Sequence, residues 1–257
     1  MHTWFWQTAS GLPHLRCSLL ADWSHGFFGR QAWSHLPQHL TEVLEPGSQA
    51  FRLKQVHGNE VVNVTEAWSS FSHTSLIPGD GLLTKEPGQS LWVCSADCTP
   101  VLIADSQSGH VCAVHSGWRG TATQIVPKAI AHLQREGSEL NNLFIALGPA
   151  ISGTVYQVSI DVALQVISTL QGGQNRTTSE LNHWLQSSNP PLFPDPESGK
   201  IRLDIRRVIS LQLEQLGISP PQVASAPHCT YTQTNDYFSY RRDGLKQVQW
   251  SGIVSRW

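Results

Sequence analysis

The sequence has no long hydrophobic run and no sign of an export signal. None of its segments reaches the length of about 18 consecutive apolar residues that a membrane-spanning helix needs. The N-terminus also lacks the basic start and continuous apolar stretch of a secretory signal peptide. We therefore expect no membrane-spanning segment and no secretion, and we predict a cytoplasmic location.

Charge is also scarce, since charged residues make up only 14% of the chain and the net charge is −2. Proteins that bind nucleic acid or anionic membranes usually present a basic face. We therefore expect neither of these partners and predict that the protein binds a small molecule. The five cysteines are an odd number without the spacing of a disulfide framework, which predicts reduced thiols.

Apolar residues are plentiful, because they form 40% of the chain and include ten Trp. A chain of 257 residues with this composition can bury the core of one domain. We predict a single domain over residues 1–257, working as a monomer or a small homo-oligomer.

Short apolar segments bounded by Gly, Pro, Asp and Ser predict strands within residues 51–64, 79–84, 90–98, 100–105, 110–118 and 141–152. Helical spacing of apolar residues predicts three helices: from near Gln124 to Gly137, from an N-cap at Ser159, and from an N-cap at Asp204 to Gly217. Residues 171–200 are polar and rich in Pro and Gly, which predicts a long surface loop. Consecutive strands with peripheral helices indicate an α+β fold.

Three residues combine metal-binding side chains with strand ends that carry Gly or Pro: His57 in KQVHGN, Cys98 in SADCTP and His115 in AVHSGWRG. Functional residues concentrate at such strand ends and loops. Two imidazoles and one thiolate match the open three-ligand set of a catalytic zinc site, in which the fourth position is left for water or substrate. The metal hypothesis depends on ligand type, because the spacing matches no compact zinc motif.

The same residues permit other roles. Cys98 could act as a nucleophile, with His115 or His57 as its base and Asp97 as an orienting group. All three could also be structural, as an exposed turn residue, a packed strand residue and a hydrogen-bonded core histidine.

A second cluster lies in FSYRRDG near the C-terminus, where Arg241 and Arg242 follow Tyr240. Arginine forks suit phosphate or carboxylate, and aromatic rings stack on a base. These three residues are candidate substrate-binding residues, together with Arg119 and Gln55, which lie in the motifs of the proposed ligands. A strand followed by a charged turn would account for the cluster equally.

Taken in order, these segments resemble the YfiH-type family, also called the laccase-domain or multicopper polyphenol oxidase family and, in some bacteria, the peptidoglycan editing factor. The resemblance rests on the following segments: HGFFGR (25–30), KQVHGN (54–59), GDGLLT (79–84), SADCTPVLIAD (95–105), AVHSGWRGT (113–121), GPAISGTVYQV (148–158), LDI (203–205) and CTYTQTNDYFSYRRDG (229–244). Two departures are Ala150, where the family commonly has Cys, and a shortened loop after HGF.

The resemblance implies a layered α/β/β/α arrangement with a β-sandwich-like core. It also implies that His57, Cys98 and His115 hold the metal and carry catalysis, with zinc expected and copper possible as the ion. The implied activity is that of a purine nucleoside phosphorylase, which acts with phosphate on adenosine, inosine and methylthioadenosine, together with adenosine deamination. An open zinc site can activate water for attack on C6 of adenine, which is the chemistry of deamination.

The family's other labels leave alternatives. Phenol oxidation by several coppers fits poorly, because a laccase needs many more His ligands than this set provides. A metal- or Cys98-dependent hydrolase that edits a peptidoglycan precursor remains an alternative, as does a non-catalytic metal-binding protein. For the general acid or base, Asp80 and Asp97 are the nearest carboxylates by motif, and each also suits a structural turn or a contact to a ligand.

Overall fold

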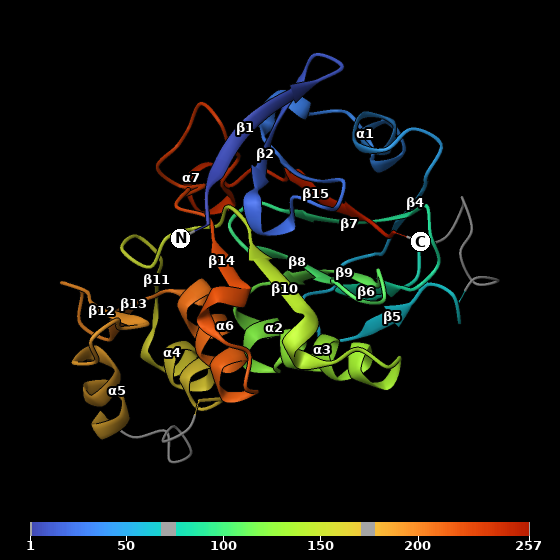
Figure 1. Ribbon diagram of the computed structural model, residues 1–257. Coiled ribbons are helices and arrows are strands. Elements are labelled where there is room, and N and C mark those ends of the chain that lie inside the picture. The colour runs from blue at the N-terminus through green and yellow to red at the C-terminus, as the bar shows by residue number, and fades with distance from the viewer. Residues whose placement is uncertain (1, 68–75, 171–177, 257) are drawn as a thin grey trace.

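Two six-stranded sheets stack face to face at the centre of the computed structural model, which describes residues 2–67, 76–170 and 178–256 (Figure 1). The first sheet has the order β1 (Trp4–Ala9), β2 (Leu12–Cys17), β3 (His25–Phe28), β15 (Gln249–Val254), β7 (Gln89–Ser95) and β4 (Gln49–Arg52). The second has the order β14 (Val223–Ser225), β10 (Leu143–Leu147), β8 (Thr99–Asp105), β9 (Val111–Ser116), β6 (Gly81–Thr84) and β5 (Val61–Asn63).

Side chains of the second sheet alternate between two apolar cores. In β8, Val101 and Ile103 point to the core beneath the helices, whereas Leu102 and Ala104 point to the core between the sheets. All four are fully buried, as expected for a strand covered on both faces. The near-continuous apolar sequence of β8 therefore reflects its position in the middle of the layers.

Helices cover the outer faces of both sheets, which gives the order α/β/β/α (Figure 1). The second sheet is covered by α2 (Trp118–Ala122), α3 (Ile125–Arg135), α4 (Ile160–Ile167) and α6 (Ile205–Gln215), and the first by α1 (Pro37–Leu44). The predicted α+β class and layer order are confirmed.

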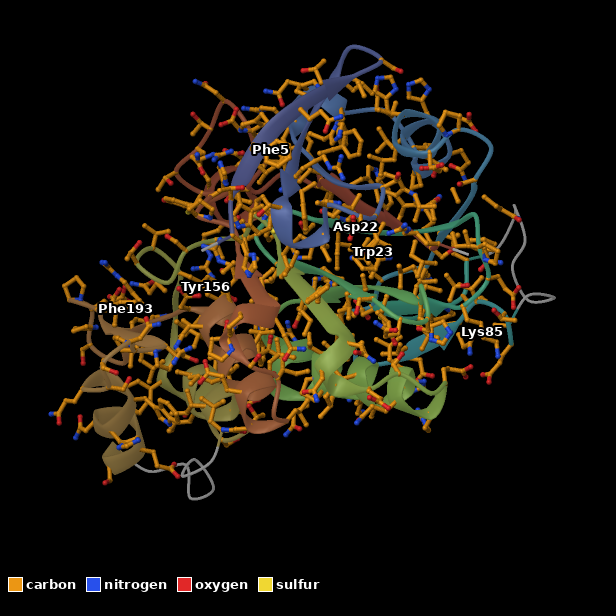
Figure 2. All side chains as sticks on the ribbon, viewed as in Figure 1. Phe5, Asp22, Trp23, Lys85, Tyr156 and Phe193 are labelled. Carbon is orange, nitrogen blue, oxygen red and sulfur yellow. The ribbon has the colours of Figure 1, made fainter. Side chains whose placement is uncertain are left out.

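Smaller elements lie at the edges. A three-stranded sheet contains β11 (Gln157–Ser159), β13 (Lys200–Leu203) and β12 (Leu192–Pro194), with α5 (Thr178–Leu185) beside it and the short α7 (Tyr240–Asp243) near the C-terminus. Short 3-10 helices span Ser18–Leu20, Arg30–Ala32, Leu140–Asn142 and Pro220–Gln222. In Figure 2, Tyr156 and Phe193 lie on the side of the molecule with the small sheet, and Lys85 lies at the opposite edge.

The helix starts expected from sequence are confirmed. The Ser159 side chain accepts a hydrogen bond from the backbone of Val162, and the Asp204 side chain accepts one from Arg207. The helix after Gln124 begins at Ile125. These capping contacts are local, which is why the sequence pattern alone predicts them.

Two expectations are wrong. Residues 51–64 form two separate strands, because the chain leaves β4 after Arg52 and re-enters a sheet only at β5. The predicted loop over 171–200 contains α5 and β12, since Leu181, Trp184 and Leu192 are buried in the core beneath the helices. Residues 171–177 of that loop lie outside the described residues.

Across the three described stretches of the chain, no helix is both long and apolar enough to cross a bilayer.

Candidate functional site

The register of the β8–β9 hairpin brings Cys98 next to His115. Thr99 pairs with Ser116 and Pro100 pairs with His115 in this antiparallel ladder. Cys98 directly precedes Thr99, so it lies beside the end of β9 at the edge of the second sheet. Two residues whose spacing in the sequence matches no compact metal motif thus become neighbours in the structure.

The carboxylate of Asp80 connects the third residue to this pair. It accepts backbone N–H groups from Val56 and Gly58 on Oδ2, at 3.0 and 2.8 Å, and from His57 on Oδ1 at 3.0 Å. His115 Nδ1 lies 2.8 Å from Oδ1 as well. Asp80 is fully buried, and one carboxylate therefore fixes both the backbone of the His57 segment and the ring of His115.

These contacts orient both imidazoles. His57 has a φ of 59°, in the left-handed region, a conformation that costs a non-glycine residue about 1–3 kcal/mol and persists only where surrounding contacts hold it. For His115, the carboxylate can only accept, so Nδ1 carries the proton and Nε2 is directed to other partners. A carboxylate behind a histidine is the arrangement that orients metal-bound histidines in proteins.

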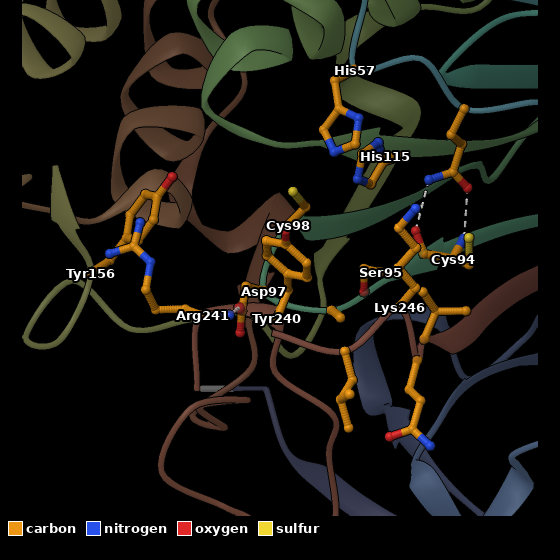
Figure 3. Close-up of a pocket in the computed structure, with 15 residues that line it drawn as sticks. His57, Cys94, Ser95, Asp97, Cys98, His115, Tyr156, Tyr240, Arg241 and Lys246 are labelled. Carbon is orange, nitrogen blue, oxygen red and sulfur yellow. Dashed lines mark hydrogen bonds between the residues drawn. The ribbon is translucent and has the colours of Figure 1, made fainter. Parts of the chain in front are cut away.

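The ligand atoms of His57, Cys98 and His115 all lie within 4.8 Å of one another (Figure 3). The two imidazole rings are nearly perpendicular, at 85°, with centroids 4.9 Å apart. A tetrahedral zinc ion with bonds of about 2.0–2.3 Å would hold such atoms roughly 3.5 Å apart, so small side-chain movements would close the set. Two nitrogens and one sulfur fit zinc in type, and small movements would bring them to the separation that zinc requires.

Electrostatics prepares the sulfur as a ligand. Burial raises the pKa of the Cys98 thiol, but the charge of His115 and hydrogen bonds with His115 and His57 outweigh burial and lower this pKa to about 6. Burial lowers the pKa of His115, but the Cys98 thiolate and Asp80 raise it to about 9. In the metal-free protein at neutral pH, Cys98 and His115 therefore form a thiolate–imidazolium pair.

Gly117 provides the space for this thiolate. A Cβ atom on Gly117 would lie 2.7 Å from the Cys98 sulfur and 3.6 Å from Cδ2 of His57. Any other residue would thus force the sulfur or the backbone beside it to shift. The glycine of the HSGWRG segment is required by this close approach.

The three residues lie at one end of a cavity of about 550 Å³. His57 is exposed, Cys98 is half-buried and His115 is buried, so the cluster extends from the cavity mouth inwards. Tyr156, Tyr240 and Arg241 line one side of the cavity. In the view of Figure 3, Tyr240 lies between Arg241 on one side and Ser95 and Lys246 on the other.

Arg241 is held in the cavity wall. Its guanidinium donates a hydrogen bond of 2.6 Å to the Gln157 carbonyl and lies 4.9 Å from the ring centre of Tyr156. Its backbone N–H donates to Asp97, whose other oxygen accepts from the Thr230 hydroxyl. Asp97 thus fixes the start of α7 against the turn before β8 and thereby holds Arg241 in place.

The other candidate arginines do not line the cavity. Arg119 is exposed and stacks on Trp118, 4.3 Å from the ring centre. Arg242 donates to the carbonyls of Thr230, Tyr231 and Tyr237 and forms an ion pair with Asp243. Its guanidinium holds the C-terminal segment together.

Gln55 lines the cavity, but its amide is already paired. The nitrogen donates to the Cys94 carbonyl and the oxygen accepts the Cys94 N–H, both at 2.7 Å (Figure 3). The Gln55 side chain thereby attaches the His57 segment to β7.

Tyr156, Ser95 and Lys246 are cavity residues that the sequence analysis did not select. Tyr156 and Ser95 stand inside the segments GPAISGTVYQV and SADCTPVLIAD, so those segments held the signal for them. Nothing in the sequence distinguishes Lys246 from other exposed lysines.

Comparison with known proteins identifies the family. The model of the multi-copper polyphenol oxidoreductase laccase family matches residues 34–254. The chain belongs to this family. A purine nucleoside phosphorylase of Synechocystis sp. is 48% identical over 256 residues, which cover 98% of this chain and 97% of that relative.

Solved structures agree with this assignment to the laccase family. The crystal structure of YlmD from Geobacillus stearothermophilus superposes with a TM-score of 0.82 at 26% identity, and the match covers 99% of this chain and all of that one. The Bacillus licheniformis protein YfiH has the same fold, with a TM-score of 0.77 at 22% identity over 98% of this chain and 99% of that one. The resemblance to the YfiH-type family is confirmed.

Proposed function

We propose that this protein is a zinc-dependent purine nucleoside phosphorylase that also deaminates adenosine, with its active site in the cavity beside His57, Cys98 and His115. The observation that carries the proposal is the convergence of these three ligands at one end of a cavity. A relative named purine nucleoside phosphorylase that is 48% identical over nearly the whole chain supports the substrate class.

The cavity suits a nucleoside in size and character. Its volume of about 550 Å³ falls within the usual range of about 300–1,000 Å³ for small-molecule sites. Tyr156 and Tyr240 contribute aromatic rings to the lining, which suits a flat base. Arg241, stacked on Tyr156, stiffens that wall.

Phosphorolysis exchanges one bond at the ribose. A phosphate oxygen attacks C1′, the bond from C1′ to N9 breaks, and its electron pair leaves with the purine. The proton that hydrogenphosphate brings equals the proton that the departing base takes up, so the products are ribose 1-phosphate and the free base. Enzymes accelerate such a step by positioning phosphate near C1′ and by stabilising the charge of the leaving base.

His57, Cys98 and His115 would hold zinc through two nitrogens and one sulfur, and Asp80 would keep His115 and the His57 segment in place. Bound zinc supplies Lewis-acid chemistry, which suits both a departing purine and the hydrolytic deamination of adenosine. Because Cys98 has a lowered pKa, its thiolate is available as a ligand at neutral pH.

Phenol oxidation, which the family description suggests, suits the residues less well. Multicopper oxidation requires several copper ions with many histidine ligands. Within the described residues, His57, Cys98 and His115 are the one group of three or more candidate metal ligands.

One observation favours a second candidate. Cys98, His115 and Asp80 form a chain of a thiolate, an imidazole and a carboxylate, which is also the arrangement of a cysteine nucleophile with its base and orienting group. A Cys98-dependent hydrolase acting on a peptidoglycan precursor amide is therefore the alternative. A third possibility is a non-catalytic metal-binding protein.

Product analysis separates these functions. Purified protein of known metal content is incubated with adenosine, with and without phosphate, and adenine, ribose 1-phosphate and inosine are quantified. The proposal expects phosphate-dependent adenine release that disappears in His57→Ala, Cys98→Ala and His115→Ala together with the metal. Full activity of metal-free protein would refute it. Loss of metal from all three variants with loss of turnover in Cys98→Ala alone would favour the nucleophile.

A further inference from the structure

Two cationic side chains line the cavity outside the metal-ligand cluster, Arg241 and Lys246. Arg241 already donates to the Gln157 carbonyl and stacks on Tyr156. Asp97, which also lines the cavity, accepts the backbone N–H of Arg241, so a carboxylate lies on that side. A dianion such as hydrogenphosphate would there meet a guanidinium that already holds a backbone carbonyl and stacks on a ring, with the Asp97 carboxylate on the same side.

Lys246 differs in both respects. It is exposed, lines the cavity, and forms no hydrogen bond or ion pair with any residue in the described part of the chain. A flexible ammonium group without a partner is a good binder of phosphate as a point charge. Its ammonium group is therefore the cavity cation whose donors all lack a partner within the described residues.

An independent observation comes from a second residue of the cavity lining. The hydroxyl of Ser95 has no hydrogen-bond partner among the described residues, although Ser95 is only 3% exposed and lines the same cavity. Leaving a buried hydroxyl unpaired destabilises a fold, so such groups usually have a ligand or ordered water as partner. In the view of Figure 3, Ser95 and Lys246 both appear on the side of Tyr240 away from Arg241.

We infer that Lys246 and Ser95 form the phosphate subsite of the cavity, in which the Lys246 ammonium attracts the anion and the Ser95 hydroxyl donates a hydrogen bond to it. This inference rests on the proposed phosphorolysis. The phosphate would bind on the Lys246 side of Tyr240, and the base would bind against the Tyr156 wall. Arg241 then shapes the base side of the cavity and leaves phosphate binding to Lys246.

The first test compares Lys246→Met, Lys246→Arg and Ser95→Ala with the wild type. We expect Lys246→Met to raise the KM for phosphate roughly 10- to 100-fold, the usual effect of losing a charged hydrogen bond, while the KM for adenosine changes less than threefold. Lys246→Arg should restore most of the phosphate affinity. Lys128→Met, which removes an exposed lysine on α3 outside the cavity, is the matched control and should behave as wild type.

Ser95→Ala provides a readout that a purely structural role cannot give. Because the wild-type hydroxyl is buried and unpaired, replacing it by a methyl group should leave the unfolding temperature unchanged or raise it. The same substitution should raise the KM for phosphate roughly 10-fold or more, as expected for one hydrogen bond to a charged group. A lower unfolding temperature with unchanged phosphate KM would overturn the role of Ser95.

Equilibrium binding of inorganic phosphate, measured by calorimetry on zinc-loaded protein, separates this inference from the proposed function. If the wild type binds phosphate, Lys246→Met does not and Lys246→Arg does, the subsite stands even if no nucleoside is cleaved. If Lys246→Met binds phosphate as tightly as wild type, or if the wild type binds none, the inference is wrong whatever the turnover.

Discussion

Replacing Asp80 by Asn tests whether one buried carboxylate organises the metal-ligand cluster. Asp80 accepts four hydrogen bonds, two on each oxygen, from the backbone of Val56, His57 and Gly58 and from the ring of His115. An asparagine amide has the same shape but only one accepting atom. Whichever way the amide faces, two of the four donors lose their acceptor.

The magnitude follows from that count. The backbone donors are partly buried and the His115 ring is buried. A fully buried unpaired donor costs about 1–3 kcal/mol, so Asp80→Asn should lower the free energy of unfolding of the metal-free protein by roughly 1–4 kcal/mol at pH 7. Because the left-handed His57 conformation and the His115 ring both depend on this carboxylate, zinc affinity should fall as well. Losing the residue behind a metal-bound histidine typically weakens binding about 10- to 100-fold.

Urea unfolding and zinc competition against a chromogenic chelator measure the two effects separately. Asp105→Asn is the matched control, because Asp105 is also buried and accepts two backbone N–H groups, from Gln107 and Ser108, in the β8–β9 turn. Both N–H groups bond to Oδ1, so an asparagine can keep them, and this variant controls for the loss of a buried carboxylate charge and should keep its zinc affinity. If Asp80→Asn loses stability but binds zinc as tightly as the wild type, Asp80 does not position the ligands.

The pH dependence gives a second check on Asp80. Burial alone would raise its pKa, but the hydrogen bond with His115 and those from Gly58 and Val56 lower it below the ordinary value. A carboxylate whose folded pKa is lowered stabilises the fold above its unfolded pKa of about 3.9, and this stabilisation is lost as pH falls through the folded value. The difference in unfolding free energy between wild type and Asp80→Asn should therefore be constant from about pH 6 to pH 5 and shrink below about pH 4. It should also fall as pH rises above about 6.5, because Asp80 helps to raise the pKa of His115. A difference that persists unchanged at pH 2 would mean that the ionised carboxylate is not its source.

Three further predictions concern the reactivity of Cys98, the glycine that lies against its sulfur, and a close contact between the two sheets. In metal-free protein, alkylation of Cys98 by iodoacetamide should rise with pH around a midpoint of about 6 and then level off, because the thiolate is the reactive form. Bound zinc should protect Cys98 from alkylation, and peptide mass spectrometry measures both effects. A midpoint near 9 would contradict the pairing of Cys98 with histidine. Gly117→Ala should reduce zinc content by displacing the Cys98 sulfur, whereas Gly58→Ala, where the new Cβ meets no atom closer than 3.5 Å, should retain it. Gly148→Ala would place a Cβ 2.3 Å from the Phe27 ring. Urea unfolding should therefore show that the free energy of unfolding falls by at least about 1–3 kcal/mol. If the variant is as stable as the wild type, the two sheets can move apart easily at this point.

Local signals predicted the elements whose stabilising contacts are also local. The caps at Ser159 and Asp204 bond to residues three positions away, so the sequence pattern contained the whole interaction. By contrast, β1 buries little of its length and carries mostly exposed side chains, and it therefore lacks an alternating apolar pattern. Helix α5 was missed for a related reason, since Leu181 and Trp184 are its buried anchors in a polar segment.

The chemistry of the metal-ligand cluster was predictable, but its geometry was not. His57, Cys98 and His115 were selected because of their ligand types and their position at strand ends. Their convergence depends on the β8–β9 register and on Asp80, which follows the turn before β6 and pairs with residues more than twenty positions away on either side. Long-range register of this kind leaves no trace in local spacing.

Of the two adjacent arginines, Arg241 lines the cavity and Arg242 does not, and this difference has a geometric cause. Successive residues of a helix diverge by about 100°, so Arg241 and Arg242 in α7 cannot both face one cavity. Which of them does depends on how α7 is anchored, through Asp97 accepting the N–H of Arg241 and Ser239 accepting that of Arg242. Both anchors come from outside the pair, so the sequence RR alone cannot decide between them.

The same anchoring explains why Lys246, the cavity cation without a partner among the described residues, comes after α7 in the chain. At Gly244 the backbone enters the left-handed region, with a φ of 65°, and its N–H bonds back to the Tyr240 carbonyl, which ends α7. This glycine-dependent turn redirects the chain, and Lys246 follows it at the cavity wall. The charged RRDG sequence therefore serves mainly to build the turn that brings Lys246 to the cavity, because Arg242 holds backbone carbonyls and Arg241 holds the wall.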